Sequence, residues 1–128
     1  MHLNEFMQSY ADEIKGNYSE YDEERSVIIV PLKDDRFQAV IAEIDQDKQL
    51  VNISSKVCDS EENVNIKQLL IENHNHPFCK FALANGFLKV ESNFNTINLD
   101  ETLLKKVILD VANLADDWEF KITGKDIF

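Results

Sequence analysis

Apolar residues at the start of the chain recur at the spacing of an α-helix. Between residues 3 and 14 they follow one another at intervals of three or one, which places them on one stripe of an amphipathic helix. Gly16 and Asn17 favour the end of that helix, and residues 18–25, which are polar and acidic, indicate a loop. The apolar stripe consists of Leu3, Phe6, Met7, Tyr10, Ala11 and Ile14.

Residues 26–57 have the alternation and the β-branched content of three strands. The segment 27–32 is apolar, and Pro31 near its end indicates an edge strand or the end of a strand. Asp34-Asp35 favours a turn into a second strand over residues 37–44. A polar turn then leads to a third strand, in which apolar and polar residues alternate.

A short helix and a hairpin follow. Asn65 favours an N-cap, with Gln68 three residues later, and the helix is expected to end before Pro77. Asn85-Gly86, between two apolar alternations, is typical of a type I′ turn because both central residues tolerate a positive φ. This turn fixes the register. It pairs Leu83 with Leu88 and Phe81 with Val90 on one face, and Lys80 with Glu91 on the other.

The turn at Asp34-Asp35 decides which side chains of the first two strands share a face. A tight turn pairs Leu32 with Phe37, Val30 with Ala39 and Ile28 with Ile41 on the core face, which Val51 and Ile53 then join. The opposite face keeps apolar residues of its own, although it is commonly polar when helices cover only one side of a sheet. Unless a helix covers it, such a patch indicates a surface for a partner or a second copy. The predicted surface consists of Val27, Ile29, Val40, Ala42 and Phe87.

The last predicted element is a long amphipathic helix. Asn98 is its expected N-cap, with Glu101 three residues later as in a capping box. Apolar residues continue at helical spacing to Trp118, and Gly124 favours the C-cap. Four aromatic residues lie on stripes that are expected in the core: Phe6, Tyr10, Phe81 and Trp118.

The predicted order is helix, three strands, helix, two strands, helix. It gives an α+β fold with an antiparallel β-sheet, in a single domain over residues 1–128. This order, α-β-β-β-α-β-β-α, resembles the class I type III secretion chaperone-like fold and the related bacterial sensory transduction regulator (YbjN-type) family. The resemblance covers essentially the whole chain. It is carried by element order and apolar spacing in the segments 65–70, 78–87, 99–104 and 111–116.

The resemblance implies a domain that forms homodimers and binds other polypeptides. Secretion chaperones hold an extended segment of a client protein against apolar patches on an acidic body. The regulator-type relatives have less defined roles, so the resemblance alone implies no particular client.

Composition and charge narrow the choice of partners. The chain has 128 residues, of which 44% are hydrophobic and 29% charged, enough for one domain with one core. Thirteen basic residues against twenty-four acidic ones give a net charge of −11, which disfavours nucleic acid and anionic membranes. The acids concentrate in turns and on polar helix faces. We interpret them as a solvated frame around a largely uncharged binding surface.

The cysteines and the first residues predict a cytoplasmic protein. Cys58 and Cys79 are too few for a disulfide framework, so we expect reduced thiols. The N-terminal residues have neither the basic nor the apolar region of a secretory signal. No segment of the sequence reaches the roughly 18 consecutive apolar residues that a membrane span needs, so no membrane partner is expected.

Candidate catalytic and metal-binding residues are few. His74, His76 and Cys79 lie close together, but a fourth zinc ligand is missing and the hairpin register turns Cys79 toward the core. Neither cysteine has a base partner in the sequence, and no glycine-rich phosphate loop follows a strand. We therefore expect no catalytic residues, no cofactor and no metal. Five pairs of adjacent acids, expected to be solvated, are 12–13, 23–24, 34–35, 61–62 and 116–117.

The leading hypothesis is a non-enzymatic, homodimeric protein-binding module with a chaperone-like or regulatory role. It would bury apolar side chains of a partner polypeptide, with strand addition at a sheet edge as a further contact. The alternative is an immunity-type inhibitor that uses its acidic charge to bind a basic toxin. A metal-dependent or small-molecule enzyme around residues 74–79 is the least favoured hypothesis.

Overall fold

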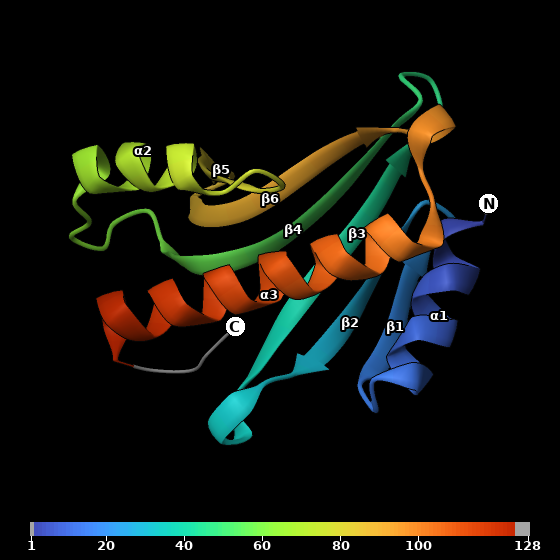
Figure 1. The fold of residues 1–128 in the computed structure, drawn as a ribbon, viewed down its shortest axis with the longest axis horizontal. Coiled ribbons are helices and arrows are strands. Elements are labelled where there is room, and N and C mark those ends of the chain that lie inside the picture. Colours follow the sequence, from blue (N-terminus) through green and yellow to red (C-terminus); the bar gives the residue numbers. More distant parts are fainter. Residues whose placement is uncertain (1, 125–128) are drawn as a thin grey trace.

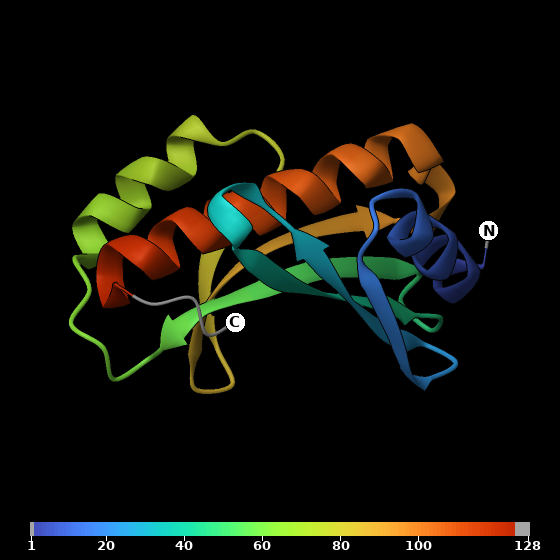
Figure 2. The same ribbon diagram turned by 90° about the horizontal axis from the view of Figure 1, so that it is seen from below.

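A six-stranded antiparallel sheet runs through the protein, with helices on one of its faces (Figures 1 and 2). The computed structural model describes residues 2–124. In space the strands follow the order β1-β2-β3-β4-β6-β5. Their bounds are β1 Asn17–Asp22, β2 Arg25–Pro31, β3 Phe37–Asp45, β4 Leu50–Asp59, β5 Lys80–Ala84 and β6 Phe87–Asn95.

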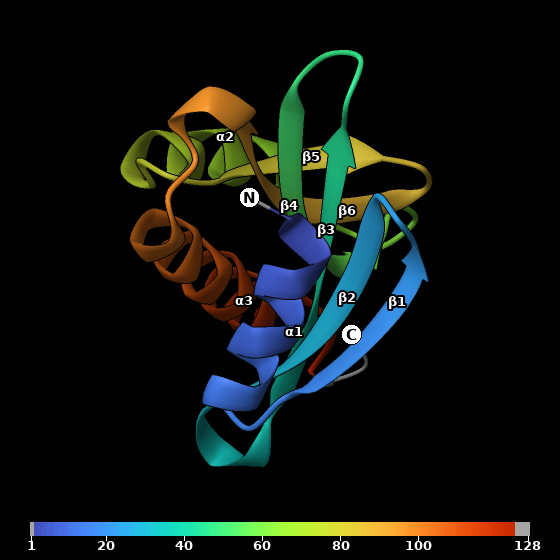
Figure 3. The same ribbon diagram turned by 90° about the vertical axis from the view of Figure 1, so that its right-hand side faces the viewer.

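The first and the last helix bury the apolar stripes that the sequence predicts. Helix α1 (Leu3–Glu13) lies alongside β1 and β2, as Figure 3 shows, and α3 (Glu101–Thr123) crosses β3, β4 and β6. Helix α2 (Ile66–Asn75) lies beside β5 at the edge of the sheet. The four aromatic residues expected in the core are buried there, so that prediction is confirmed: Phe6, Tyr10, Phe81 and Trp118.

The predicted α+β fold with an antiparallel sheet is confirmed, but one strand was missed. Residues 18–25 were expected to form a loop, whereas residues 17–22 form the edge strand β1, so four strands precede α2. Only Tyr18 of this strand is partly buried, opposite Ile28 of β2. The strand is held by backbone pairing to β2 and therefore lacks the apolar alternation by which strands are predicted.

The register of β2 and β3 differs by one residue from the prediction. Asp34 and Asp35 both take a positive φ, and the connecting loop is closed by the Leu32 N–H, which donates to the Arg36 carbonyl at 2.8 Å. The strands then start pairing at Pro31 and Phe37, so Leu32 is not opposite Phe37. Pro31 thus ends an interior strand, which confirms the strand end and excludes the edge-strand alternative.

This shift exchanges the faces of β3. Val40 and Ala42, predicted on the outer surface, are fully buried in the core, where Val40 lies opposite Ile28. Ala39 and Ile41 instead share the outer face with the residues they oppose on β2. A register error of one residue turns every side chain of a strand to the other face, which explains the whole difference. Val51 and Ile53 accordingly lie with Ile44 and Ala42, and not with Ile41.

The β5–β6 hairpin has the predicted turn and register. Asn85 and Gly86 have φ of 55° and 82°, as a type I′ turn requires. The pairs predicted on both faces are all present, so the register is confirmed: Leu83 with Leu88, Phe81 with Val90, and Lys80 with Glu91.

The helix caps agree with the sequence at two ends, the N-terminus of α2 and the C-terminus of α3, and differ at the N-terminus of α3. Asn65 caps α2 by accepting from the Gln68 N–H at 3.1 Å, and Gly124 ends α3 with φ 71°. The N-cap of α3 is Asp100, which accepts from the Leu103 N–H at 2.8 Å. Asn98 was the expected cap, but its backbone ends the short 3₁₀ helix η2 (Thr96–Asn98) and α3 begins three residues later.

One of the acid pairs expected to be solvated contains a buried carboxylate. Asp116 on α3 is 2% exposed and accepts from the Arg36 guanidinium through Nη2 at 2.8 Å and Nε at 2.9 Å. The hydrogen bond to Asp116 raises the pKa of Arg36, which therefore stays charged. This ion pair fastens the β2–β3 loop to α3.

Candidate partner-binding surfaces

The open face is the side of the sheet that points away from α1 and α3. Within residues 2–124 no helix covers this face, so the alternative of a helix that shields it is not found in the described part of the chain (Figure 2). Of the predicted surface residues, Val27, Ile29 and Phe87 lie on this face and are partly buried, whereas Val40 and Ala42 do not. The structure therefore brings together part of the predicted patch.

The β2–β3 half of the open face is apolar. Ile29 pairs with Ala39 and Val27 pairs with Ile41, so these four side chains form one continuous block. Phe37 begins β3 at the same face and is 41% exposed. Sequence reasoning missed Ala39 and Ile41 because the turn that sets their register has two acids, Asp34 and Asp35, in a left-handed conformation.

The β4–β6–β5 half of the open face is charged, contrary to the expectation of a largely uncharged surface. Lys56 of β4 lies directly opposite Lys89 of β6, and the Lys56 Nζ is 4.1 Å from the centroid of the Phe87 ring. Asn52 Nδ2 donates to the Glu91 carboxylate at 3.3 Å and to Asn93 Oδ1 at 2.9 Å. These strands are far apart in the sequence and no tight turn joins β4 to β6, so local patterns could not reveal the lysine pair.

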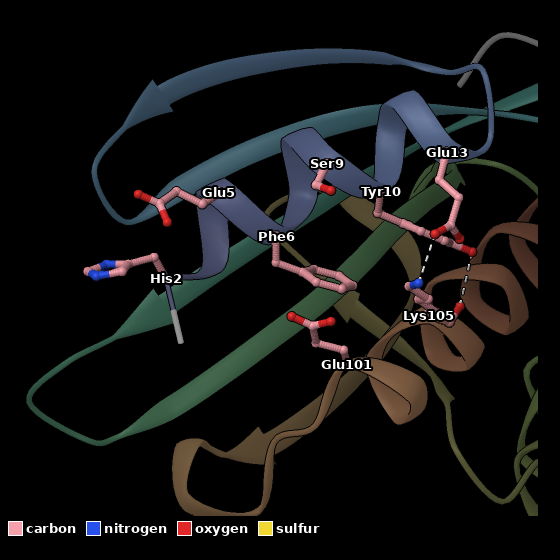
Figure 4. Close-up of a pocket in the computed structure, with 8 residues that line it drawn as sticks. All are labelled: His2, Glu5, Phe6, Ser9, Tyr10, Glu13, Glu101 and Lys105. Carbon is pink, nitrogen blue, oxygen red and sulfur yellow. Dashed lines mark hydrogen bonds and ion pairs between the residues drawn. The ribbon is translucent and has the colours of Figure 1, made fainter.

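A hollow of about 420 Å³ separates α1 from the start of α3 (Figure 4). Its aromatic wall is formed by Phe6 and Tyr10, whose rings stack at 5.8 Å, and burial raises the pKa of Tyr10. The Lys105 Nζ lies 2.9 Å from the Glu13 carboxylate. Two further carboxylates, those of Glu5 and Glu101, also line the hollow, so it is acidic as well as aromatic.

Helix α2 exposes most of its apolar side chains. Only Leu69 is buried against the rest of the protein. Leu70 and Ile71 are 65% and 57% exposed, and Ile66 lines one hollow with Leu83 of β5. We call this surface the α2 patch, which consists of Ile66, Leu70, Ile71 and Leu83.

The two edges of the sheet differ. At β5, the Phe81 N–H donates to Asn73 Oδ1 at 2.7 Å, and Asn73 Nδ2 lies 3.4 Å from the Phe81 carbonyl. Lys80 Nζ also donates to the carbonyls of Asn73 and His76, which ties the end of α2 to this strand. A side chain thus occupies the β5 edge as a neighbouring strand would, whereas β1 is an exposed edge strand.

The structure gives different surroundings to the three residues considered as metal ligands, His74, His76 and Cys79. His76 Nε2 lies 3.4 Å from Glu72 Oε2, His74 is exposed, and Cys79 is buried, with a pKa that burial raises to about 11. Within residues 2–124 no three His, Cys, Asp or Glu side chains are grouped so that they could hold a metal ion. No helix in the same range has the length and apolar character needed to cross a membrane.

Comparison with known proteins identifies similar structures but no family. No family model matches the chain, and no curated protein sequence matches it. A chain in the crystal structure of the ExsC–ExsE complex is 14% identical, with a TM-score of 0.66, over 94% of this chain and 92% of that one. A chain in the structure of the HopA1–SchA chaperone–effector complex is 11% identical, with a TM-score of 0.61, over 96% and 97%. These similarities confirm the type III secretion chaperone-like α+β fold.

Proposed function

We propose that this chain is a non-enzymatic protein-binding module, with a chaperone-like or regulatory role, which acts in the cytoplasm as a homodimer that holds a partner polypeptide. The observation that carries the proposal is the uncovered open face, whose β2–β3 half is a block of apolar side chains. The similar fold of a chain in a chaperone–effector complex supports it. The regulatory form of the same role follows only from the resemblance of the predicted element order to the YbjN-type regulators.

The open face offers the partner apolar contact over a rigid sheet. Val27, Ile29 and Ile41 are partly buried by their neighbours and remain accessible from one side. An extended segment with apolar residues at alternate positions would bury its side chains against them and leave its other side in water. The acids that surround the sheet would keep the empty protein soluble.

Strand addition would take place at β1. Its outer edge is exposed, and its only partner strand within residues 2–124 is β2, while Asn4 Nδ2 donates to the carbonyl of its last residue, Asp22, at 2.8 Å. The other edge is occupied at Phe81 by the Asn73 side chain. A partner segment that pairs with β1 would extend the sheet and its open face together.

The experiment that tests the proposal uses a labelled model peptide with alternating Ile and Thr residues. We expect it to bind the full-length chain and to shift amide NMR signals of β2 and β3. Ile29→Asp should weaken binding about tenfold, because a carboxylate in an apolar contact must be desolvated. Asn93→Asp, a change of the same charge at the polar end of the open face, serves as the control. Absence of binding, or equal binding by both variants, would refute the proposal.

The alternative, an immunity-type inhibitor of a basic toxin, is favoured by the acidic hollow between α1 and α3. Glu5 and Glu101 leave two carboxylates beside the stacked rings of Phe6 and Tyr10, a setting that suits an Arg or Lys side chain. Binding by this mode would weaken steeply as salt rises, whereas apolar binding at the open face would not. Titration of the model peptide and of a poly-lysine peptide at 50 mM and 500 mM salt separates the two functions.

A further inference from the structure

Lys56 and Lys89 form a like-charge pair in a protein whose net charge is −11. Like charges directly opposite each other on a sheet are destabilising. Other cross-strand pairs of the open face follow the opposite rule, since Lys80 faces Glu91 and Arg25 faces Glu43. Within residues 2–124 neither Lys56 nor Lys89 forms an ion pair.

The backbone at Lys56 is adapted to hold that side chain in place. A β-bulge lies between Lys56 and Cys58, and bulges commonly redirect a side chain at functional sites. The buried Gln38 donates to the Lys56 carbonyl at 2.7 Å, and Ser55 Oγ donates to the Ala39 carbonyl at 2.6 Å. These side chains bridge β3 and β4 beyond the last ladder pair, while the Phe87 ring supports the ammonium group from the side.

The two lysines lie between apolar parts of the open face. On one side are Ala39 and the Ile29 that it opposes, and on the other side Ala82 pairs with Lys89. A polypeptide laid across these strands would exclude water from the lysine pair. An anion delivered there would be attracted more strongly than at a fully solvated surface.

We propose that the lysine pair Lys56–Lys89 receives a carboxylate of the bound segment, so that the module selects an extended apolar segment with an Asp or Glu side chain at this point. This inference rests on the proposed function. The acidic body repels acidic segments in general, and the lysine pair provides a local attraction on the open face that fixes which residue of the segment lies there.

The test uses three labelled peptides that alternate Ile and Thr and differ only at the central residue, which is Asp, Asn or Lys. We expect the full-length chain to bind the Asp peptide about fivefold more tightly than the Asn peptide, and the Lys peptide more weakly. Lys89→Glu should abolish the Asp preference and improve binding of the Lys peptide. Lys48→Glu, in the β3–β4 turn at the far end of the sheet, changes the net charge equally and should leave the preference unchanged.

The possible results separate this inference from the proposed function. Equal binding of all three peptides, or a preference that survives Lys89→Glu, would overturn the lysine-pair assignment and leave the open face as a partner surface. Binding of none of them would overturn both proposals. Amide shifts at β4 and β6 on addition of the Asp peptide support the assignment, whereas shifts confined to α1 and α3 contradict it.

Discussion

At the scale of single residues, the sheet carries a like-charge pair, Lys56 and Lys89, that is expected to lower its stability. Lys89 opposes Lys56 at a position where an acid would complete the alternation of charges seen at Lys80 and Glu91. Residues that lower stability in the absence of a ligand are commonly those that bind one. The destabilisation caused by the lysine pair can be measured on the protein alone, with no bound polypeptide.

Lys89→Glu should therefore stabilise the protein while it removes the proposed carboxylate site. We expect the free energy of unfolding to rise by about 0.2–1 kcal/mol, because a like-charge pair becomes an opposite-charge pair. Urea denaturation monitored by circular dichroism measures the change. Lys48→Glu gains no cross-strand ion pair and adds negative charge to an acidic protein, so it should not raise the free energy of unfolding. A loss of stability in Lys89→Glu would mean that the lysine pair is not under repulsion.

The two cysteines give a second prediction at this scale. Burial raises the pKa of Cys58 and of Cys79 to about 11 each. At pH 8 only about 0.1% of each thiol is then the reactive thiolate. We expect Ellman's reagent to modify both thiols only as fast as the protein opens, and at once in urea. Rapid labelling of either thiol in the folded protein would contradict this.

The same thiols make stability fall at alkaline pH. Their pKa is higher in the folded than in the unfolded chain, where it is 9.0, so the folded state keeps protons that the unfolded state releases. Their contribution is fully present below pH 9 and is lost as the pH rises toward 11. Urea denaturation at pH 8 and pH 10 should show a smaller loss for the double variant Cys58→Ala and Cys79→Ala than for the natural chain.

At the scale of the elements, the turns decide how far the sequence predicts the structure. Asn85-Gly86 allows one short turn with one register, so the β5–β6 pairs could be derived residue by residue. Asp34-Asp35 favours a turn but does not specify its length, since a positive φ is uncommon for residues other than glycine and both residues have one here. One residue of loop length was enough to exchange Val40 and Ala42 for Ala39 and Ile41 on the open face.

Features that depend on distant pairing could not be predicted from local patterns. Strand β1 has almost no buried side chain, and its existence depends on β2. Lys56 and Lys89 are neighbours because β4 pairs with β6 across the intervening α2 and β5. Of the predicted patch, Val27, Ile29 and Phe87 lie on the open face, whereas Val40 and Ala42 lie in the core, and partner binding at this face stays a prediction.

The Asn73 side chain, which pairs with the edge strand β5, gives a prediction at the scale of one element. Asn73→Ala removes the side chain that pairs with both backbone groups of Phe81. We expect a loss of about 1 kcal/mol in the free energy of unfolding, since the Phe81 groups must find water instead. Asn75→Ala, at an exposed position of the same helix, is the control and should change little. The uncapped edge should also promote self-association at high concentration, which sedimentation velocity measures.

At the scale of the whole molecule, the candidate surfaces lie at different places. The open face is on the side of the sheet opposite α1 and α3, the acidic hollow lies between those two helices, and the α2 patch is beside the β5 edge. A second copy bound at the α2 patch would leave the apolar block of β2 and β3 accessible. The proposed homodimer and the proposed complex with a partner are therefore compatible in this arrangement.

The α2 patch is where we expect the two copies of the proposed homodimer to meet. A twofold contact pairs the same surface of each copy, and Leu70 is the most exposed apolar side chain of α2. Leu70→Asp should raise the dimer dissociation constant at least about tenfold, because two carboxylates would face a closed apolar interface. Gln68→Asp, an exposed change of charge on the same helix, should have a much smaller effect. Light scattering over a concentration series measures both, and Ile29→Asp should leave the dimer intact because its site is on the open face. A monomeric natural chain, or a dimer that Leu70→Asp does not weaken, would refute the assignment of this surface.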